Sequence, residues 1–267
     1  MIDLTINAML RILRNSKLLD KPEFVAKKKE MLYNIQKGGV CMDKLRLTGN
    51  QLKLIAAVTM TLDHIGAYLF PSVWWLRMVG RLAFPIFAYM VGEGGRYTRC
   101  PKRYFLTMAI AAAVCQMVDF VARDSLYQCI LVTFSMSIGL IGLLRNAEEK
   151  KTPTAWLLVA TGLGGAIFVC KVIPKLLPGF GVDYGIIGVL IPVMVYAAGD
   201  KVRALLALTM GLACLANGSL YIQWLSLLAV PLLMLYNGQR GKANMKWFFY
   251  IYYPAHLVVI YFIGFLL

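Results

Sequence analysis

Histidine is scarce in this chain, with two residues among 267, His64 and His256. Acidic residues are also few, because 13 Asp and Glu stand against 28 Lys and Arg and leave a formal net charge of +15. The six cysteines are scattered, with no CxxC pair and no spacing typical of metal ligands. These shortages argue against a metal centre, and we expect most of the cysteines to pack as small apolar residues.

Long apolar runs are what the chain has instead. Hydrophobic residues make up 60% of it and its mean hydropathy is +0.67, above the usual values for a soluble domain of this length. The runs predict an all-α, polytopic integral membrane protein whose partner is the lipid bilayer. A basic excess in such a chain is typical of cytoplasmic loops, so we expect no nucleic-acid binding. No cleaved signal peptide is expected, because the first apolar run is short and contains Arg11.

Nine apolar segments approach the length of about 20 residues that a bilayer requires. They cover residues 52–70, 74–92, 104–122, 126–144, 155–173, 183–198, 202–217, 220–236 and 247–267. The loops between them alternate in basic content, with twelve Lys and Arg in one set and four in the other. The positive-inside rule therefore places the N-terminus in the cytoplasm and the C-terminus outside, in a bacterial-type inner or plasma membrane.

Two parts of the chain are distinguished. We expect residues 1–50 to form a basic cytoplasmic arm and residues 51–267 to form the transmembrane domain. A second interpretation of residues 1–41 stays open: Gly38 and Gly39 are placed where their codons would supply a ribosome-binding sequence, so Met42 is an alternative start.

Ionisable residues lie deep inside three of the predicted spans. A charge at helix-centre depth costs roughly 2.5–3.5 kcal/mol, so such residues are functional candidates. At 1.5 Å per residue, Asp63, His64 and Arg81 share one level, and His256 reaches it from the last span. We expect the two histidines to meet and Arg81 to pair with Asp63, either in a site or as a structural ion pair. Arg77, one turn from Arg81, is expected to bind an anion or a lipid headgroup nearer the surface.

A proline lies beside the second histidine. Pro254 removes one backbone hydrogen bond two residues before His256, which predicts a kink in the last span. Tyr252 and Tyr253 lie one turn from His256, so their hydroxyl groups extend the site in one interpretation. In the other, they belong to an interfacial aromatic belt that begins at Trp247.

Four sequence motifs together resemble those of the TraX family. They are LKLIAAVTMTLDHIG from Leu52, GRLAFPIFAYMVGEG from Gly80, DYGIIGVL from Asp183, and LYNGQRGKANMKWFFYIYYPAHL from Leu235. The resemblance covers nearly everything from residue 51 onward. It implies a transmembrane acyltransferase that takes an acyl group from acyl-CoA on the cytoplasmic side, the family being named for the acetylation of conjugative pilin.

The resemblance also assigns residues. The intramembrane histidine of the superfamily falls on His64, and the other positions carried over are Asp63, Arg81, Asp183, Tyr184 and His256. The chain departs from the family pattern at Tyr127 and Gln128, near an expected asparagine, which leaves the acceptor undecided.

Acyl transfer from a thioester needs a base for the attacking group and donors for the oxyanion. We expect His64 to be the base, with Asp63 and His256 beside it, and His256 or a tyrosine such as Tyr253 to be the oxyanion donor. An acyl-histidine intermediate stays open. The phosphates of coenzyme A are expected at basic cytoplasmic loops, although orientation alone also explains these charges. The candidates are Arg96, Arg99, Lys102, Arg103, Arg240 and Lys242.

The function predicted is therefore that of an integral membrane acyltransferase, with acetyl-CoA as co-substrate and no metal. Its acceptor is an amine or a hydroxyl, and a peptide amine, a sugar hydroxyl and a lipid headgroup all stay open. The alternative is a proton-coupled carrier, because an Asp, a His and an Arg at one depth also suit a proton relay. A catalytically silent membrane scaffold is the third hypothesis. Asp119 and Glu93 lie at span ends, either as edge residues or as site residues.

Overall fold

The computed structural model describes residues 46–218, 221–243 and 245–267. Residues 1–45 fall outside it, so the basic arm and the alternative start at Met42 stay predictions. The chain divides by its contacts into two units, Met1–Arg46 and Leu47–Leu267. The second unit contains every motif discussed above.

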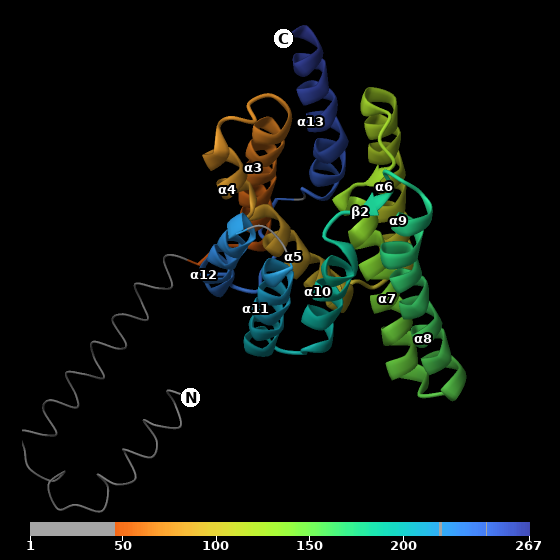
Figure 1. Cartoon of the computed structure of the whole chain (residues 1–267). Helices are drawn as coiled ribbons and strands as arrows, with labels where there is room; N and C mark the ends of the chain where they lie inside the picture. The colour runs from red at the N-terminus through yellow and green to blue at the C-terminus, as the bar shows by residue number, and fades with distance from the viewer. Residues whose placement is uncertain (1–45, 219–220, 244) are drawn as a thin grey trace, which may run out of the picture. The chain divides into compact units, whose positions relative to one another are not determined.

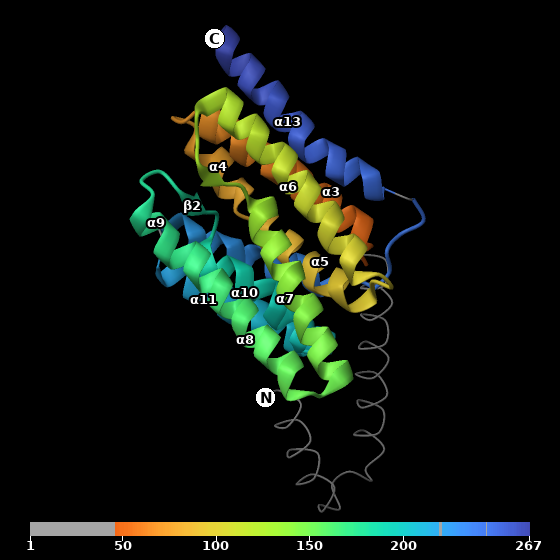
Figure 2. The ribbon, with the colours of Figure 1, turned by 90° about the vertical axis from the view of Figure 1, so that its right-hand side faces the viewer.

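The second unit is helical, as the apolar runs predict (Figures 1 and 2). Its longer α-helices are α3 (Gly49–Tyr68), α5 (Ala83–Tyr97), α6 (Pro101–Arg123), α7 (Ile130–Lys150), α8 (Pro153–Ile167), α10 (Gly185–Ala197), α11 (Lys201–Asn217) and α13 (Lys246–Leu266). The shorter ones are α4 (Trp74–Gly80), α9 (Ile173–Leu176) and α12 (Ala229–Met234), with a π-helical segment η2 (Phe168–Val172) and a 3-10 helix η3 (Tyr221–Leu228). Two short strands, β1 (Tyr127–Gln128) and β2 (Gly181–Val182), pair in parallel.

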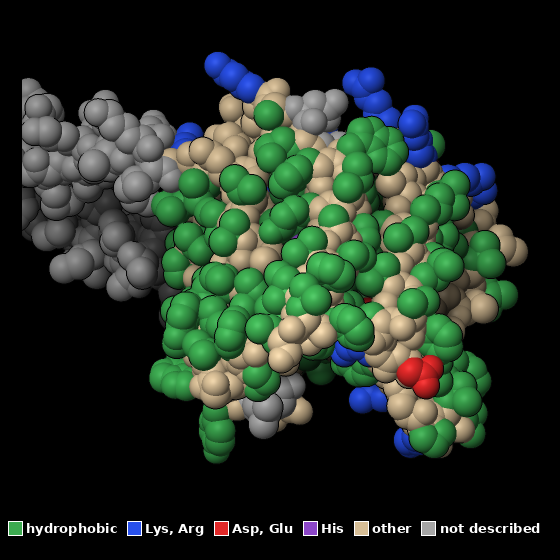
Figure 3. All heavy atoms as spheres, turned by 90° about the horizontal axis from the view of Figure 1, so that it is seen from above, with side chains coloured by type: hydrophobic (Ala, Val, Ile, Leu, Met, Phe, Trp, Pro, Cys, Tyr) green, Lys and Arg blue, Asp and Glu red, His purple; other side chains and the backbone are tan. Residues whose placement is uncertain are grey.

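Within the described residues, four helical stretches are long and apolar enough to cross a membrane. They are Pro101–Arg123, Ile130–Lys150, Pro153–Leu176 and Trp247–Leu266. Large apolar side chains stay exposed along these stretches, and hydrophobic atoms cover much of the face shown in Figure 3, as expected for contact with lipid. The protein is therefore an all-α membrane protein. The count of nine spans and the orientation of the N-terminus stay predictions.

The second predicted span, 74–92, is not one helix. It is broken after Gly80 into α4 and α5, with Arg81 and Leu82 between them. Pro85 explains the break, because a proline lacks the N–H that would bond to the carbonyl of Arg81 and its ring clashes with that carbonyl. Pro231 has the same effect in the eighth predicted span, 220–236, because it cannot donate to the carbonyl four residues earlier, inside η3. The first half of that span is accordingly the 3-10 helix η3, and only the second half is the α-helix α12.

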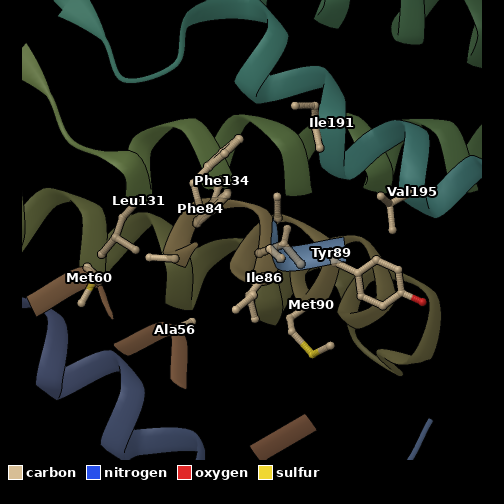
Figure 4. Close-up of a cluster of buried hydrophobic side chains, with 14 of the residues drawn as sticks. Ala56, Met60, Phe84, Ile86, Tyr89, Met90, Leu131, Phe134, Ile191 and Val195 are labelled. Atoms are coloured by element: carbon tan, nitrogen blue, oxygen red, sulfur yellow. The ribbon is translucent and has the colours of Figure 1, made fainter. Parts of the chain in front are cut away.

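Helix α5 forms the centre of the unit. It packs against α3, α7 and α10, and Figure 4 shows its side chains Ile86 and Tyr89 among residues of these helices. Ile86 is 0% exposed and Tyr89 is 1% exposed. The last helix, α13, packs against α3 and α6. This packing brings the first and last motifs together although about 190 residues separate them.

The segment before α13 also fastens the start of α3. Backbone N–H groups of Gly49 and Asn50 donate to the carbonyls of Gln239 and Arg240, at 2.8 and 3.0 Å. The first N–H groups of a helix have no intrahelical acceptor, so this loop satisfies them. The motif that begins at Leu235 therefore positions Arg240 beside the first turn of α3.

Candidate functional site

The two histidines meet, as predicted from their depth. His64 on α3 and His256 on α13 lie with Nδ1 and Nε2 2.7 Å apart, and their rings are stacked within 9° of parallel. His256 is 7% exposed. Its Nδ1 atom is 3.0 Å from the carbonyl oxygen of Tyr252.

This chain of contacts determines which nitrogen atoms hold protons. A carbonyl oxygen only accepts, so Nδ1 of His256 must donate to Tyr252. Neutral His256 then has its lone pair on Nε2, which accepts from Nδ1–H of His64. Neutral His64 consequently keeps an unprotonated Nε2 atom. The arrangement leaves one imidazole nitrogen able to accept a proton from another molecule.

Asp63 is held by two arginines rather than one. Its carboxylate oxygens lie 2.8 Å from Arg81 and 2.8 Å from Arg77, so the predicted contact with Arg81 is confirmed. The guanidinium group of Arg77 also binds Asp63, and the expected anion or headgroup site at Arg77 stays a prediction. Gly80 makes this geometry possible: a methyl group there would overlap the Asp63 side chain. Helices α3 and α4 therefore approach closely where the ion pairs form.

A second ion-paired group joins Asp119, which the sequence left open as an edge or a site residue, to Arg123, which was not a site candidate. Asp119 on α6 is 4% exposed and accepts from Arg123 at 3.0 Å and from the Tyr261 hydroxyl. The guanidinium carbon of Arg123 lies 4.8 Å from the Tyr68 ring centroid and 5.3 Å from that of Tyr261. The sequence held a signal for this group, since an acid and an arginine four residues apart end an otherwise apolar helix.

Both ion-paired groups line one polar cavity of about 260 Å³, which we call the polar chamber. Its walls also carry His64, Asp183, Tyr184 and Tyr253. Three arginines and three aspartates face this small space, so their charges balance. The polar chamber therefore offers hydrogen-bond donors and acceptors around His64 without a net charge.

Strand pairing places Asp183 in the polar chamber. The N–H of Asp183 donates to the carbonyl of Gln128 at 3.1 Å, and Thr133 donates through its hydroxyl to the carbonyl of Asp183 at 2.7 Å. Tyr184 has a positive φ of 58° and stacks on Phe84 with ring centroids 3.9 Å apart. The position at which the chain departs from the family pattern is thus the strand that positions the DYG motif.

A larger, mainly apolar cavity of about 490 Å³ lies beside the earlier turns of α3 and α13, the helices that carry the histidines, and we call it the apolar chamber. Met60, Met90, Met108 and Phe134 line its interior. Its basic lining residues are Lys53, Arg99, Arg103 and Arg240. Lys53 was not among the sequence candidates, although its place at the start of the first predicted span could have indicated it.

Three of the six predicted phosphate-binding residues do not line the apolar chamber: Arg96, Lys102 and Lys242. Arg96 donates instead to the carbonyls of Val195 and Tyr196, both at 2.9 Å. Its guanidinium group therefore has a structural role at the end of α10.

Tyr253 and Ile130 line both chambers. Tyr253 is 7% exposed, and its ring stands edge-on to those of His64 and His256. Its hydroxyl makes no hydrogen bond with any residue that the structure describes. The two side chains thus form the wall between the chambers, and the wall carries a hydroxyl that is free to bind a ligand.

A family model described as TraX protein matches residues 48–264, which include every residue of both chambers. The chain belongs to the TraX family. Probable fimbrial assembly protein FimC, serogroup H1, of Dichelobacter nodosus is 26% identical over 239 residues, covering 79% of this chain and 93% of that protein. Uncharacterized protein RP591 of Rickettsia prowazekii (strain Madrid E) is 46% identical over 41 residues, covering 15% of this chain and 16% of that protein. No solved structure matches this TraX-family chain.

Proposed function

We propose that this TraX-family protein is an integral membrane acyltransferase that moves an acetyl group from acetyl-CoA to an amine or a hydroxyl. The observation that carries the proposal is the hydrogen-bond chain from His64 through His256 to the Tyr252 carbonyl. It keeps Nε2 of His64 unprotonated, and the His64 side chain lines the polar chamber. His64 is then the general base, and His256 orients it and stabilises the imidazolium that forms.

The apolar chamber suits the donor. Lys53 and His64 lie eleven positions apart on α3, so about 16 Å separates the chamber's basic end from the level of the base. The pantetheine arm of coenzyme A has about a dozen bonds between phosphate and sulfur, the reach of four extended residues, or about 13–14 Å. Phosphates near Lys53, Arg103 and Arg240 would therefore place the thioester at the depth of the wall. We place this end of the chamber in the cytoplasm, where acyl-CoA is found.

Tyr253 is the better oxyanion donor. Both ring nitrogens of His256 are engaged, one by His64 and one by a backbone carbonyl, so the earlier expectation that His256 donates to the oxyanion loses support. The Tyr253 side chain is 7% exposed and lines both chambers, and its hydroxyl has no partner among the described residues, so it is available to a developing negative charge. Asp63 is engaged by two arginines and supports the site rather than acting as a base.

The acceptor enters by the polar chamber in this proposal, from within the membrane or from its outer side. The relative from Dichelobacter nodosus is described as a probable fimbrial assembly protein, which supports an acceptor that takes part in pilus assembly in a bacterial inner membrane. A peptide amine, a sugar hydroxyl and a lipid headgroup are the classes to test.

The test uses the full-length protein purified in detergent with radiolabelled acetyl-CoA and one acceptor from each class. We expect His64→Ala to lower acetyl transfer by roughly 10²–10⁴-fold, the usual contribution of a general base. The control is Lys242→Ala, an exposed charge outside both chambers, which should leave the rate unchanged.

Equal turnover by wild type and His64→Ala would refute the assigned base. The absence of turnover with every acceptor, together with proton-driven uptake by wild-type proteoliposomes, would favour the carrier instead.

A further inference from the structure

The acyl group has to pass the wall between the chambers. Acetyl-CoA enters the apolar chamber in the proposed function, whereas His64 faces the polar chamber. A residue placed at this boundary, with a nucleophilic side chain, would carry the group across. Cys129 is such a residue, because it lines the polar chamber while its neighbours Ile130 and Leu131 line the apolar chamber.

The local structure holds the Cys129 thiol at the start of a long helix. Cys129 is the N-cap of α7, a helix of 21 residues, with extended φ and ψ of −66° and 164°. The first N–H groups of a helix lack intrahelical acceptors and the helix dipole is positive there, so a thiolate is stabilised at this position. Cys129 is a free cysteine and is 8% exposed.

Gln116 fixes this cysteine from α6. The N–H of Cys129 donates to the Gln116 side-chain oxygen at 3.3 Å. The Gln116 amide nitrogen donates to the carbonyls of Ser125 and Tyr127, at 3.3 and 3.1 Å. One side chain thus ties the whole turn before α7 to α6, and the thiol is held in a defined place rather than in a loop free to move.

Strand register and the unpartnered tyrosine give the thiol suitable neighbours. Gln128 of β1 pairs with Val182 of β2, so Cys129 and Asp183 are the residues that directly follow this pair on the two strands. Both of them line the polar chamber. Tyr253, more than nine-tenths buried, has no hydrogen-bond partner for its hydroxyl among the described residues and lines both chambers. A carbonyl oxygen at the boundary would satisfy that hydroxyl, which points to a ligand beside Cys129.

We infer that Cys129 is the nucleophile that carries the acyl group between the chambers, an inference that rests on the proposed function. The Cys129 sulfur bonds to the thioester carbonyl carbon, the bond to the coenzyme A sulfur breaks, and the thiol proton goes to the departing sulfur. The acceptor then attacks the acyl carbon of S-acyl-Cys129. The carbon–sulfur bond breaks and the proton lost by the acceptor returns, by way of His64 Nε2, to the Cys129 sulfur.

The experiment is a single turnover with the full-length protein and acetyl-CoA in the absence of an acceptor. We expect one equivalent of coenzyme A to be released in a burst and one acetyl group, labile to hydroxylamine, to appear in the protein. Peptide mapping should place it on Cys129 rather than on the neighbouring buried Cys115. Cys129→Ser should retain the acetyl group as a more stable oxygen ester.

Cys170→Ala is the matched control, because Cys170 is also a free cysteine, also 8% exposed, and lines neither chamber. With an acceptor added, we expect Cys129→Ala to lose at least about 100-fold in transfer rate and Cys170→Ala to stay within about threefold of wild type. Protection of Cys129 from a small maleimide by acetyl-CoA gives a second measurement, made on the wild-type chain, that does not depend on the folding of a variant.

The outcomes separate the two proposals. If wild type transfers acetyl groups and Cys129→Ala does so equally, without an adduct in wild type, the acyl-cysteine is refuted and direct transfer at His64 stands. If wild type neither releases coenzyme A nor transfers acetyl to any acceptor, both proposals fall.

Discussion

Arg77 and Arg81 form a matched pair of substitution sites, because both bind the Asp63 carboxylate at 2.8 Å from different environments. The Arg77 side chain is 37% exposed, so water screens its ion pair and its loss should cost about 0–1 kcal/mol. The Arg81 side chain is 12% exposed and also donates to the Gln223 side chain at 3.4 Å. Removing one partner of a buried ion pair lowers the free energy of unfolding by about 3–5 kcal/mol. For the loss of Arg81 the low end of this range applies, because Arg77 still binds the Asp63 carboxylate.

We therefore expect Arg81→Ala to lower the free energy of unfolding by about 3 kcal/mol and Arg77→Ala by less than about 1 kcal/mol. The difference of about 2 kcal/mol corresponds to roughly 30-fold in the unfolding equilibrium. Denaturation in mixed micelles, followed by the fluorescence of the five tryptophans, measures it. Adding Asp63→Asn to each variant closes a double-mutant cycle and isolates the pairwise energies. Equal losses for the two arginine variants would refute the reasoning from burial.

Two further predictions use neighbouring or equivalent positions as controls. Gly80→Ala should destabilise the fold by about 1–3 kcal/mol, because its methyl group meets the Asp63 side chain, whereas Gly164→Ala in α8 has open space and should stabilise by up to about 1 kcal/mol. The same unfolding titration measures both, and a neutral Gly80→Ala would contradict the close approach of α3 and α4. Arg103→Ala should raise KM for acetyl-CoA about tenfold while Lys102→Ala leaves it within about twofold, since only Arg103 lines the apolar chamber. Equal KM values for the two variants would remove the apolar chamber as the donor site.

The helices could be predicted well where the chain is apolar and free of proline. Residues 104–122 were expected as a span and the structure has α6 at Pro101–Arg123, with the proline at the first helical position. Depth along straight helices also brought His64 and His256 together correctly, because the rise per residue is the same in every α-helix. The contact between Asp63 and Arg81 followed from the need of a buried carboxylate for a cation.

Other parts of the site depend on contacts that no local pattern contains. Nothing near Arg123 in the sequence indicates that Tyr68 and Tyr261, on two other helices, enclose its guanidinium group. Pro85 does indicate in the sequence that a helix ends near Arg81. The prediction followed the continuous apolar run through residues 74–92 instead, and therefore gave one helix where the structure has two. Two-residue strands such as β1 and β2 are too short for any alternation of apolar and polar residues to appear.

The non-helical segments between the helices and the polar chamber beside them have one physical cause. Backbone that leaves the helical conformation inside a membrane has to satisfy its N–H and C=O groups in protein or in a polar cavity. The segment before α7 does so through Gln116 and through β1, and the segment after β2 does so through Thr133. These bonds hold both segments against the polar chamber, next to His64 and Tyr253. A chain built only of uninterrupted helices would have offered neither the space nor the backbone turns that bring Cys129 and Asp183 to the same wall.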